Sequence, residues 1–195
     1  MSNSRTVIIA GVGGQGNILA SRVLGLAAMK AGFDVKVSEV HGMSQRGGSV
    51  ITYVRYGDEV ISPVVTEGEA DYVITFEILE SARWISLLKK NGVLLTGKKK
   101  IPPVPVLSGA REYPEGIEEM LEKKGIDYLS IDAESIAKTA GLKKAENIVM
   151  LGAFAAYSDL DIEFFFDAMK DVVPERFFEI NKTAFIAGYD EVKNR

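Results

Sequence analysis

Short apolar runs alternate with longer segments of helical periodicity along the first part of the chain. Residues 7–10 form an apolar run that Gly11 closes, which predicts a buried strand. Over residues 16–31 the apolar positions recur at helical spacing, and Gly32 predicts the end of that helix. A second strand is expected over residues 35–40. This order predicts a β–α–β unit with a right-handed crossover.

A polar, glycine-rich loop follows the second strand, where a helix would be the usual next element. Residues 49–56 are rich in β-branched and aromatic side chains, and we expect them to form a hairpin with residues 60–65. Such a pair would make the sheet mixed. Residues 98–105 hold three lysines and three prolines and predict a surface loop. Further strands are expected over 70–76, 93–96 and 127–131, and helices over 77–90, 114–124, 147–157, 161–172 and 174–194.

These elements predict an α/β fold. We expect a Rossmann-like, mostly parallel sheet flanked by helices, with a β-hairpin insertion after strand two and a helical C-terminal region. Since 195 residues suffice for one substantial core, a single domain over residues 1–195 is expected. The helix over 147–157 is apolar nearly all round, which predicts burial in the core or against a partner. Phenylalanines at 164–166 indicate either a wide core face or a partly exposed or partner-binding segment.

The composition excludes several kinds of chemistry. The chain has no cysteine and one histidine, His41. Disulfides, thiolate nucleophiles and cysteine-bound iron–sulfur clusters are therefore excluded, and a zinc site of histidine and cysteine nearly so. The net charge of −4 gives no sign of nucleic-acid binding, and no apolar run approaches the roughly 20 residues that cross a bilayer. We therefore expect a cytoplasmic protein without nucleic-acid or membrane partners.

A glycine-rich turn joins the first strand to the first helix. Its sequence, Gly-Val-Gly-Gly-Gln-Gly, matches the G-x-G-x-x-G pattern in the strand–helix context that the pattern requires. Such glycines allow a tight turn, close approach of a ligand and close helix–strand packing, and the helix N-terminus favours an anion. We expect a phosphate- or carboxylate-bearing ligand, the alternative being a tight turn that binds nothing. The candidate binding residues are Gly11, Gly13, Gly14, Gln15 and Gly16.

A dinucleotide is one candidate ligand for this turn. Glu39 lies near the end of the second strand, where an acidic residue would bind the ribose of NAD. Two features disfavour NAD: the extra glycine Gly14 beside the polar Gln15, and the missing helix after the second strand.

The second glycine-rich loop, residues 41–48, reads His-Gly-Met-Ser-Gln-Arg-Gly-Gly. It is expected at the same carboxyl edge as the first loop, where ligands bind in open α/β sheets. Arg46 is a candidate to hold an anion, or else forms a surface salt bridge. His41 could transfer a proton near neutral pH, or else bond to backbone. Nothing identifies a nucleophile, so a catalytic triad is not supported.

The two loops together resemble the gamma-type domain of 2-oxoacid:ferredoxin oxidoreductases. Residues 147–153 and 181–188 add to the resemblance, which covers nearly the whole chain. Pyruvate and 2-oxoglutarate members usually carry a Tyr-Gly-Pro type of segment before the Arg-Gly pair. The His-Gly-Met-Ser-Gln-Arg-Gly-Gly form is instead similar to the indolepyruvate (arylpyruvate) branch.

The resemblance implies the small subunit of an indolepyruvate:ferredoxin oxidoreductase, inactive alone. It implies no catalytic residue in this chain, because thiamine on the partner would perform the carbon chemistry. A large alpha subunit would hold thiamine diphosphate and 4Fe–4S clusters and convert an arylpyruvate to its acyl-CoA, with ferredoxin as electron acceptor. The glycine loop and Arg46 would contact the phosphates of the co-substrate coenzyme A. The residues that would form the cleft wall or the interface are His41, Ser44, Gln45, Gly47 and Gly48. Residues 164–166 or 147–157 would contribute to the surface that binds the partner. The alternatives are the gamma subunit of a pyruvate or other 2-oxoacid oxidoreductase, an NAD(P)-binding oxidoreductase, and a non-catalytic nucleotide-binding module.

Overall fold

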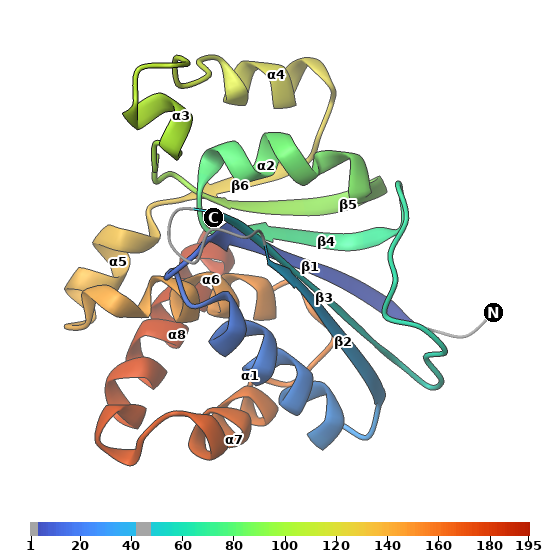
Figure 1. Cartoon of the computed structure of the whole chain (residues 1–195). Coiled ribbons are helices and arrows are strands. Elements are labelled where there is room, and N and C mark those ends of the chain that lie inside the picture. Colours follow the sequence, from blue (N-terminus) through green and yellow to red (C-terminus); the bar gives the residue numbers. More distant parts are fainter. Residues whose placement is uncertain (1–3, 42–47) are drawn as a thin grey trace.

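The computed structural model describes residues 4–41 and 48–195, and in these residues a six-stranded mixed sheet carries helices on both faces (Figure 1). The strand order is β2-β3-β1-β4-β5-β6. The strands are β1 (Arg5–Val12), β2 (Asp34–His41), β3 (Ser49–Gly57), β4 (Ala70–Thr75), β5 (Leu88–Gly97) and β6 (Tyr128–Ile131).

Helices cover the two faces unequally. In Figure 1, α2, α3 and α4 lie above the sheet, and α1 and α5 to α8 lie below it. The helices are α1 (Asn17–Lys30), α2 (Ile78–Trp84), α3 (Val104–Leu107), α4 (Ile117–Lys123), α5 (Ala133–Thr139), α6 (Glu146–Ala155), α7 (Ile162–Val172) and α8 (Phe178–Lys193). Among the helices of the described ranges, none is long and apolar enough to span a membrane.

Strand β3 runs antiparallel to both of its neighbours, β1 and β2, whereas β1, β4, β5 and β6 are parallel. The predicted mixed sheet, with antiparallel pairing after strand two, is therefore confirmed. The predicted pairing of residues 49–56 with residues 60–65 is wrong, because residues 59–66 form no strand. Since β1 and β2 occupy both edges of β3, residues 60–65 have no edge left to pair with.

Two apolar cores lie on the two faces of the sheet. Alternate residues of β1 point to opposite cores, Val7 and Ile9 to one and Ile8 and Ala10 to the other. The whole run is buried for that reason, as in strands covered on both faces.

Helix α6 is the centre of the larger core, and every residue of its span 147–155 is buried. Of the three consecutive phenylalanines of α7, Phe165 and Phe166 are buried and Phe164 packs against the same core. The wide core face is thus confirmed. The prediction that these two segments contribute to a partner surface is wrong for the residues that the chain's own core covers, and it stays a prediction for Tyr157, which is exposed.

Glycines let α6 and α8 cross at backbone contact. A Cβ on Gly152 would overlap the carbonyl of Phe185, and a Cβ on Gly188 would overlap the carbonyl of Val149. Only glycine fits at these two positions, since the obstructing atoms are backbone and cannot rotate away. This crossing fixes α6, whose N-terminus reaches the carboxyl edge of the sheet.

Candidate functional site

The candidate site is the carboxyl edge of the sheet. Strand β2 runs in the same direction as β1, because both are antiparallel to β3. The end of β1 is therefore level with the end of β2: Val12 pairs with Ser49, and His41 pairs with Val50. The expectation that both glycine-rich loops leave from one edge is confirmed. Four candidate residues of the second loop, Ser44, Gln45, Arg46 and Gly47, lie outside the described residues, as does the side chain of His41.

The glycine loop uses its third glycine to approach α6. Gly14 and Gly16 have positive φ values, +99° and +85°. A Cβ on Gly16 would overlap the side-chain amide of Asn147, whose Nδ2 donates to the Gly16 carbonyl oxygen at 3.1 Å. Gly16 precedes α1, whose N-terminus has no side-chain cap. The exposed Gly14 and this uncapped first turn are the parts of the loop that remain open to a ligand.

Gln15 links the end of β1 to the residue that follows β4. Its Oε1 accepts from the Val12 amide at 2.7 Å, and its Nε2 donates to the Phe76 carbonyl at 3.1 Å. A Cβ on Gly11 would lie 2.9 Å from the Gln15 Oε1 and 2.7 Å from the Asn17 Oδ1. Gln15 and Gly11, two candidate binding residues, therefore serve first to close the turn.

Gly48 and the first two residues of β3 are each held by a different part of the chain, and we call this arrangement the β3 clamp. The Gly48 carbonyl accepts from the Gly13 amide at 2.9 Å. The Ser49 hydroxyl donates to Glu80 of α2. The Val50 carbonyl accepts from the Asn17 Nδ2 of α1 at 3.0 Å. The clamp engages the Gly13 amide, which the sequence pattern assigns to a ligand, and so joins the two loops.

Glu80 is a buried carboxylate at the centre of this clamp, with only 2% of its surface exposed. Besides Ser49, its Oε2 accepts from the Trp84 Nε1 at 3.0 Å, and its Oε1 lies 3.3 Å from the Arg83 Nε. Buried carboxylates need such partners, because an unpaired buried charge is costly. Neither Glu80 nor Arg83 was predicted from the sequence as a site residue.

Glu77, which is 1% exposed, ties the segment after β5 to α2. Its Oε2 accepts from the Glu80 amide at 3.1 Å and so caps α2. Its Oε1 accepts from the Ile101 amide at 3.0 Å and from the Tyr113 hydroxyl. Burial and the Glu77 carboxylate both raise the pKa of Tyr113 above its usual range, which keeps the phenol a hydrogen-bond donor.

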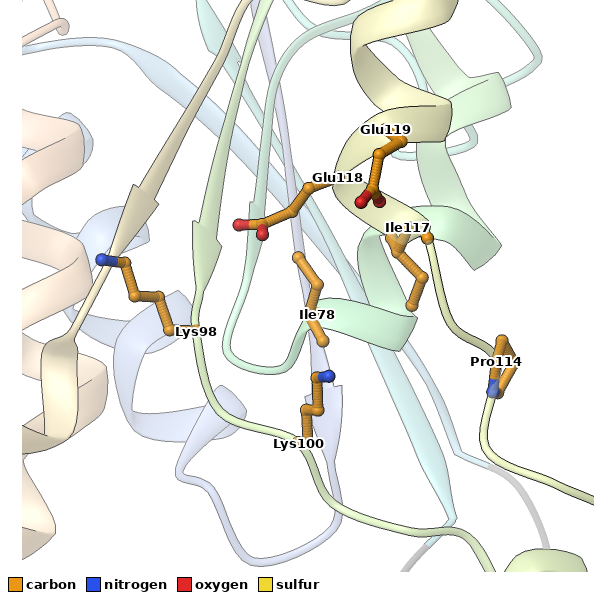
Figure 2. Close-up of a pocket in the computed structure, with 8 residues that line it drawn as sticks. Ile78, Lys98, Lys100, Pro114, Ile117, Glu118 and Glu119 are labelled. Carbon is orange, nitrogen blue, oxygen red and sulfur yellow. The ribbon is translucent and has the colours of Figure 1, made fainter.

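Among the described residues, three clefts open along this edge, and each has both acidic and basic residues in its lining. The cleft in Figure 2, about 430 Å³, has Lys98 and Lys100 after β5 and Glu118 and Glu119 on α4. Lys100 points toward Ile78 in that view. A smaller cleft, about 230 Å³, lies at the ends of β5 and β6.

The smaller cleft contains an ion network. The Lys99 Nζ lies 2.9 Å from the Glu146 Oε1 and 3.4 Å from the Glu134 Oε2. Hydrogen bonds from Lys143, Lys138 and Lys99 lower the pKa of Glu134 to about 2. Since these charges already pair with one another, the cleft has little left to attract an ionic ligand.

The third cleft, about 520 Å³, lies between α2 and residues 103–114 and adjoins the β3 clamp at Gly48 and Ser49. Its lining includes Arg83 and Arg111. Within the described residues, no group of three or more His, Cys, Asp or Glu side chains is placed to hold a metal ion.

The sheet order disfavours NAD as the ligand. Glu39 pairs with Thr52 of β3, so β3 separates the Glu39 strand from the strand of the glycine loop. At about 4.8 Å per strand, β2 lies roughly 10 Å from β1. In the dinucleotide fold the acidic residue comes from the strand next to the glycine loop.

Solved structures share this fold over its whole length. The gamma subunit of a keto/oxoacid ferredoxin oxidoreductase from Geobacter sulfurreducens matches with a TM-score of 0.73 at 25% identity, covering 98% of this chain and 99% of that one. The 2-oxoglutarate:ferredoxin oxidoreductase from Magnetococcus marinus, solved with 2-oxoglutarate, coenzyme A and succinyl-CoA bound, matches with a TM-score of 0.78 at 19% identity. That match covers all of this chain and 32% of the other chain. The fold is that of a gamma subunit of 2-oxoacid ferredoxin oxidoreductases.

Sequence comparison gives the family. Residues 6–191 match the model of the pyruvate ferredoxin/flavodoxin oxidoreductase family, and the chain belongs to this family. It is 42% identical over 192 residues to the indolepyruvate oxidoreductase subunit IorB of Pyrococcus horikoshii, covering 96% of this chain and 95% of that relative. The resemblance predicted from the two glycine-rich loops is therefore confirmed.

Proposed function

We propose that the chain is the small subunit of an indolepyruvate oxidoreductase and acts in the cytoplasm only in complex with a large subunit. Full-length similarity to an IorB protein at 42% identity is the observation that carries this proposal. A chain without cysteine cannot ligate a 4Fe–4S cluster through thiolates. The partner would therefore hold the clusters and thiamine diphosphate, and pass electrons to ferredoxin.

The carboxyl edge of the sheet is the face that we propose completes the active-site cleft. Coenzyme A is bound in the Magnetococcus marinus enzyme of the same fold, which supports it as co-substrate here. The open part of the glycine loop, at Gly14 and the uncapped first turn of α1, offers backbone N–H groups to an oxyanion. Gly11, Gly13, Gln15 and Gly16 support that turn through internal contacts, and Arg46 remains a candidate for phosphate binding.

Reconstitution of the complex tests this function. The chain and its large subunit are expressed together, and ferredoxin reduction is measured with indolepyruvate in the presence and absence of coenzyme A. We expect activity that needs both subunits and coenzyme A. Pyruvate and 2-oxoglutarate are tested in parallel, because a preference for either would favour the other branch of the family. A stable complex without activity on any 2-oxoacid would contradict the proposal.

A further inference from the structure

The cleft between α2 and residues 103–114 differs in charge from the cleft shown in Figure 2. Two lysines and two glutamates line the Figure 2 cleft, whereas the third cleft has two arginines, Arg83 and Arg111, and one glutamate, Glu112. The rest of its lining is mostly apolar, from Leu79, Pro103, Val104, Pro105, Val106 and Pro114. A ligand that fits this groove has an anionic group and an apolar body.

The guanidinium of Arg83 faces the carboxylate of Glu80 through its Nε. Its Nε lies 3.3 Å from the Glu80 Oε1, and Glu80 is itself held by the Ser49 hydroxyl and the Trp84 indole. Within the described residues, no hydrogen bond or ion pair engages the two Nη groups of Arg83. A guanidinium whose Nε faces a carboxylate leaves those two groups available as a fork that matches a carboxylate or a phosphate.

Arg111 approaches the same groove from the opposite wall. Its amide donates to the Pro105 carbonyl at 3.0 Å, which fixes the main chain at that point, and its exposed side chain forms no ion pair within the described residues. Glu77 holds the wall in place through the Ile101 amide and the Tyr113 hydroxyl. One wall of the groove is α2 itself, and Glu77 anchors the other wall to α2, which favours a preformed site.

We infer that this groove binds an oxyanion-bearing ligand with an apolar body, contacted by Arg83 and Arg111, with Glu80 as the residue that positions Arg83. The inference rests on the proposed function only for the choice of ligand. Coenzyme A would supply a phosphate, and an arylpyruvate would supply a carboxylate. The groove opens beside Gly48 and Ser49, so a ligand held there reaches the edge from which both loops leave.

The test uses the complex of both subunits and the variants Arg83→Gln, Arg111→Gln and their combination. Coenzyme A, inorganic pyrophosphate and indolepyruvate are each titrated calorimetrically into the complex, and KM and kcat are measured for both substrates. Arg176→Gln is the control, since Arg176 is exposed and stacks on Phe177 away from the groove. We expect the double variant to bind one of the ligands about tenfold or more weakly, with kcat retained. The affinities of the control variant should stay within about twofold of the wild type.

The pattern of losses identifies the ligand. Weaker binding of coenzyme A and pyrophosphate points to a phosphate, and weaker binding of indolepyruvate alone points to a carboxylate. Unchanged affinity for all three would overturn the inference. Direct binding keeps this outcome separate from the proposed function, because pyrophosphate can be titrated even into a complex that shows no turnover.

The positioning role of Glu80 has its own readout. Glu80→Gln should raise the KM of the same substrate as Arg83→Gln does, and should add little further effect when Arg83 is already replaced. A purely structural role would instead lower thermal stability and leave KM unchanged. Additive effects of the two substitutions on KM would contradict the positioning role.

Discussion

Replacing Ser49 with alanine tests the β3 clamp. The substitution removes the hydroxyl that donates to the Glu80 Oε2. Because Glu80 is only 2% exposed, water cannot easily replace that donor, although Trp84 and Arg83 remain as partners. A lost hydrogen bond to a charged group costs about 1.5–3 kcal/mol, and we expect about 2 kcal/mol here because two partners persist. For a chain of this size that corresponds to a fall in Tm of roughly 4–8 °C.

Tyr56→Phe is the matched control, at the other end of the same strand. It removes a hydroxyl that donates to the Asp159 Oδ1 at 3.1 Å, but the Asp159 side chain is 45% exposed and water can replace the lost donor. We expect a loss of about 1 kcal/mol or less. Urea denaturation of the isolated chain measures both variants, and KM in the complex should rise only for Ser49→Ala. Equal losses of stability with unchanged KM values would refute the clamp.

Three further predictions concern single substitutions. Gly16→Ala should destabilise the chain by about 1 kcal/mol more than Gly14→Ala, because both glycines have positive φ but only Gly16 touches α6. Equal urea midpoints of the two variants would contradict this. Gly188→Ala should cost about 3 kcal/mol by forcing α6 and α8 apart, and a thermal scan showing almost no loss would disprove the contact. Glu134→Gln should lower stability at pH 7, and its difference from the wild type should vanish between about pH 5 and pH 2.

The lowered pKa of Glu134 determines how its contribution to stability changes with pH. The pKa of this carboxyl falls from 4.5 to about 2 in the folded chain, because Lys143, Lys138 and Lys99 bind the charged form. The stabilisation is therefore present above about pH 4.5 and lost as the pH falls toward 2. The denaturant midpoints of Glu134→Gln and the wild type are compared at several pH values. A difference between them that stays constant down to pH 2 would show that the charge of Glu134 does not contribute to stability.

Local sequence patterns predicted most elements, because their periodicity depends on neighbouring residues. The run over 7–10 and the helix before Gly32 lie close to where they were expected. The partner of β3 was predicted wrongly, since strand pairing depends on which edges are free in the sheet. Helix α5 was missed although Asp132, which caps it by accepting from the Ser135 amide, is a helix-start signal.

The candidate site was predicted only in outline. The pattern located the glycine loop, but it assigned Gly13 and Gln15 to a ligand, and the structure engages them with the Gly48 and Phe76 carbonyls. Those partners are distant in sequence, so no local motif reveals them. Arg83 escaped notice for a similar reason, because its ion-pair partner Glu80 is held in turn by Ser49, 31 positions away.

Purification of the tagged chain from its native cell, with mass spectrometry of the proteins retained, tests the proposed function most directly. We predict a large partner in near-stoichiometric amount that contains iron and thiamine diphosphate. A chain that elutes alone and binds NAD would contradict it.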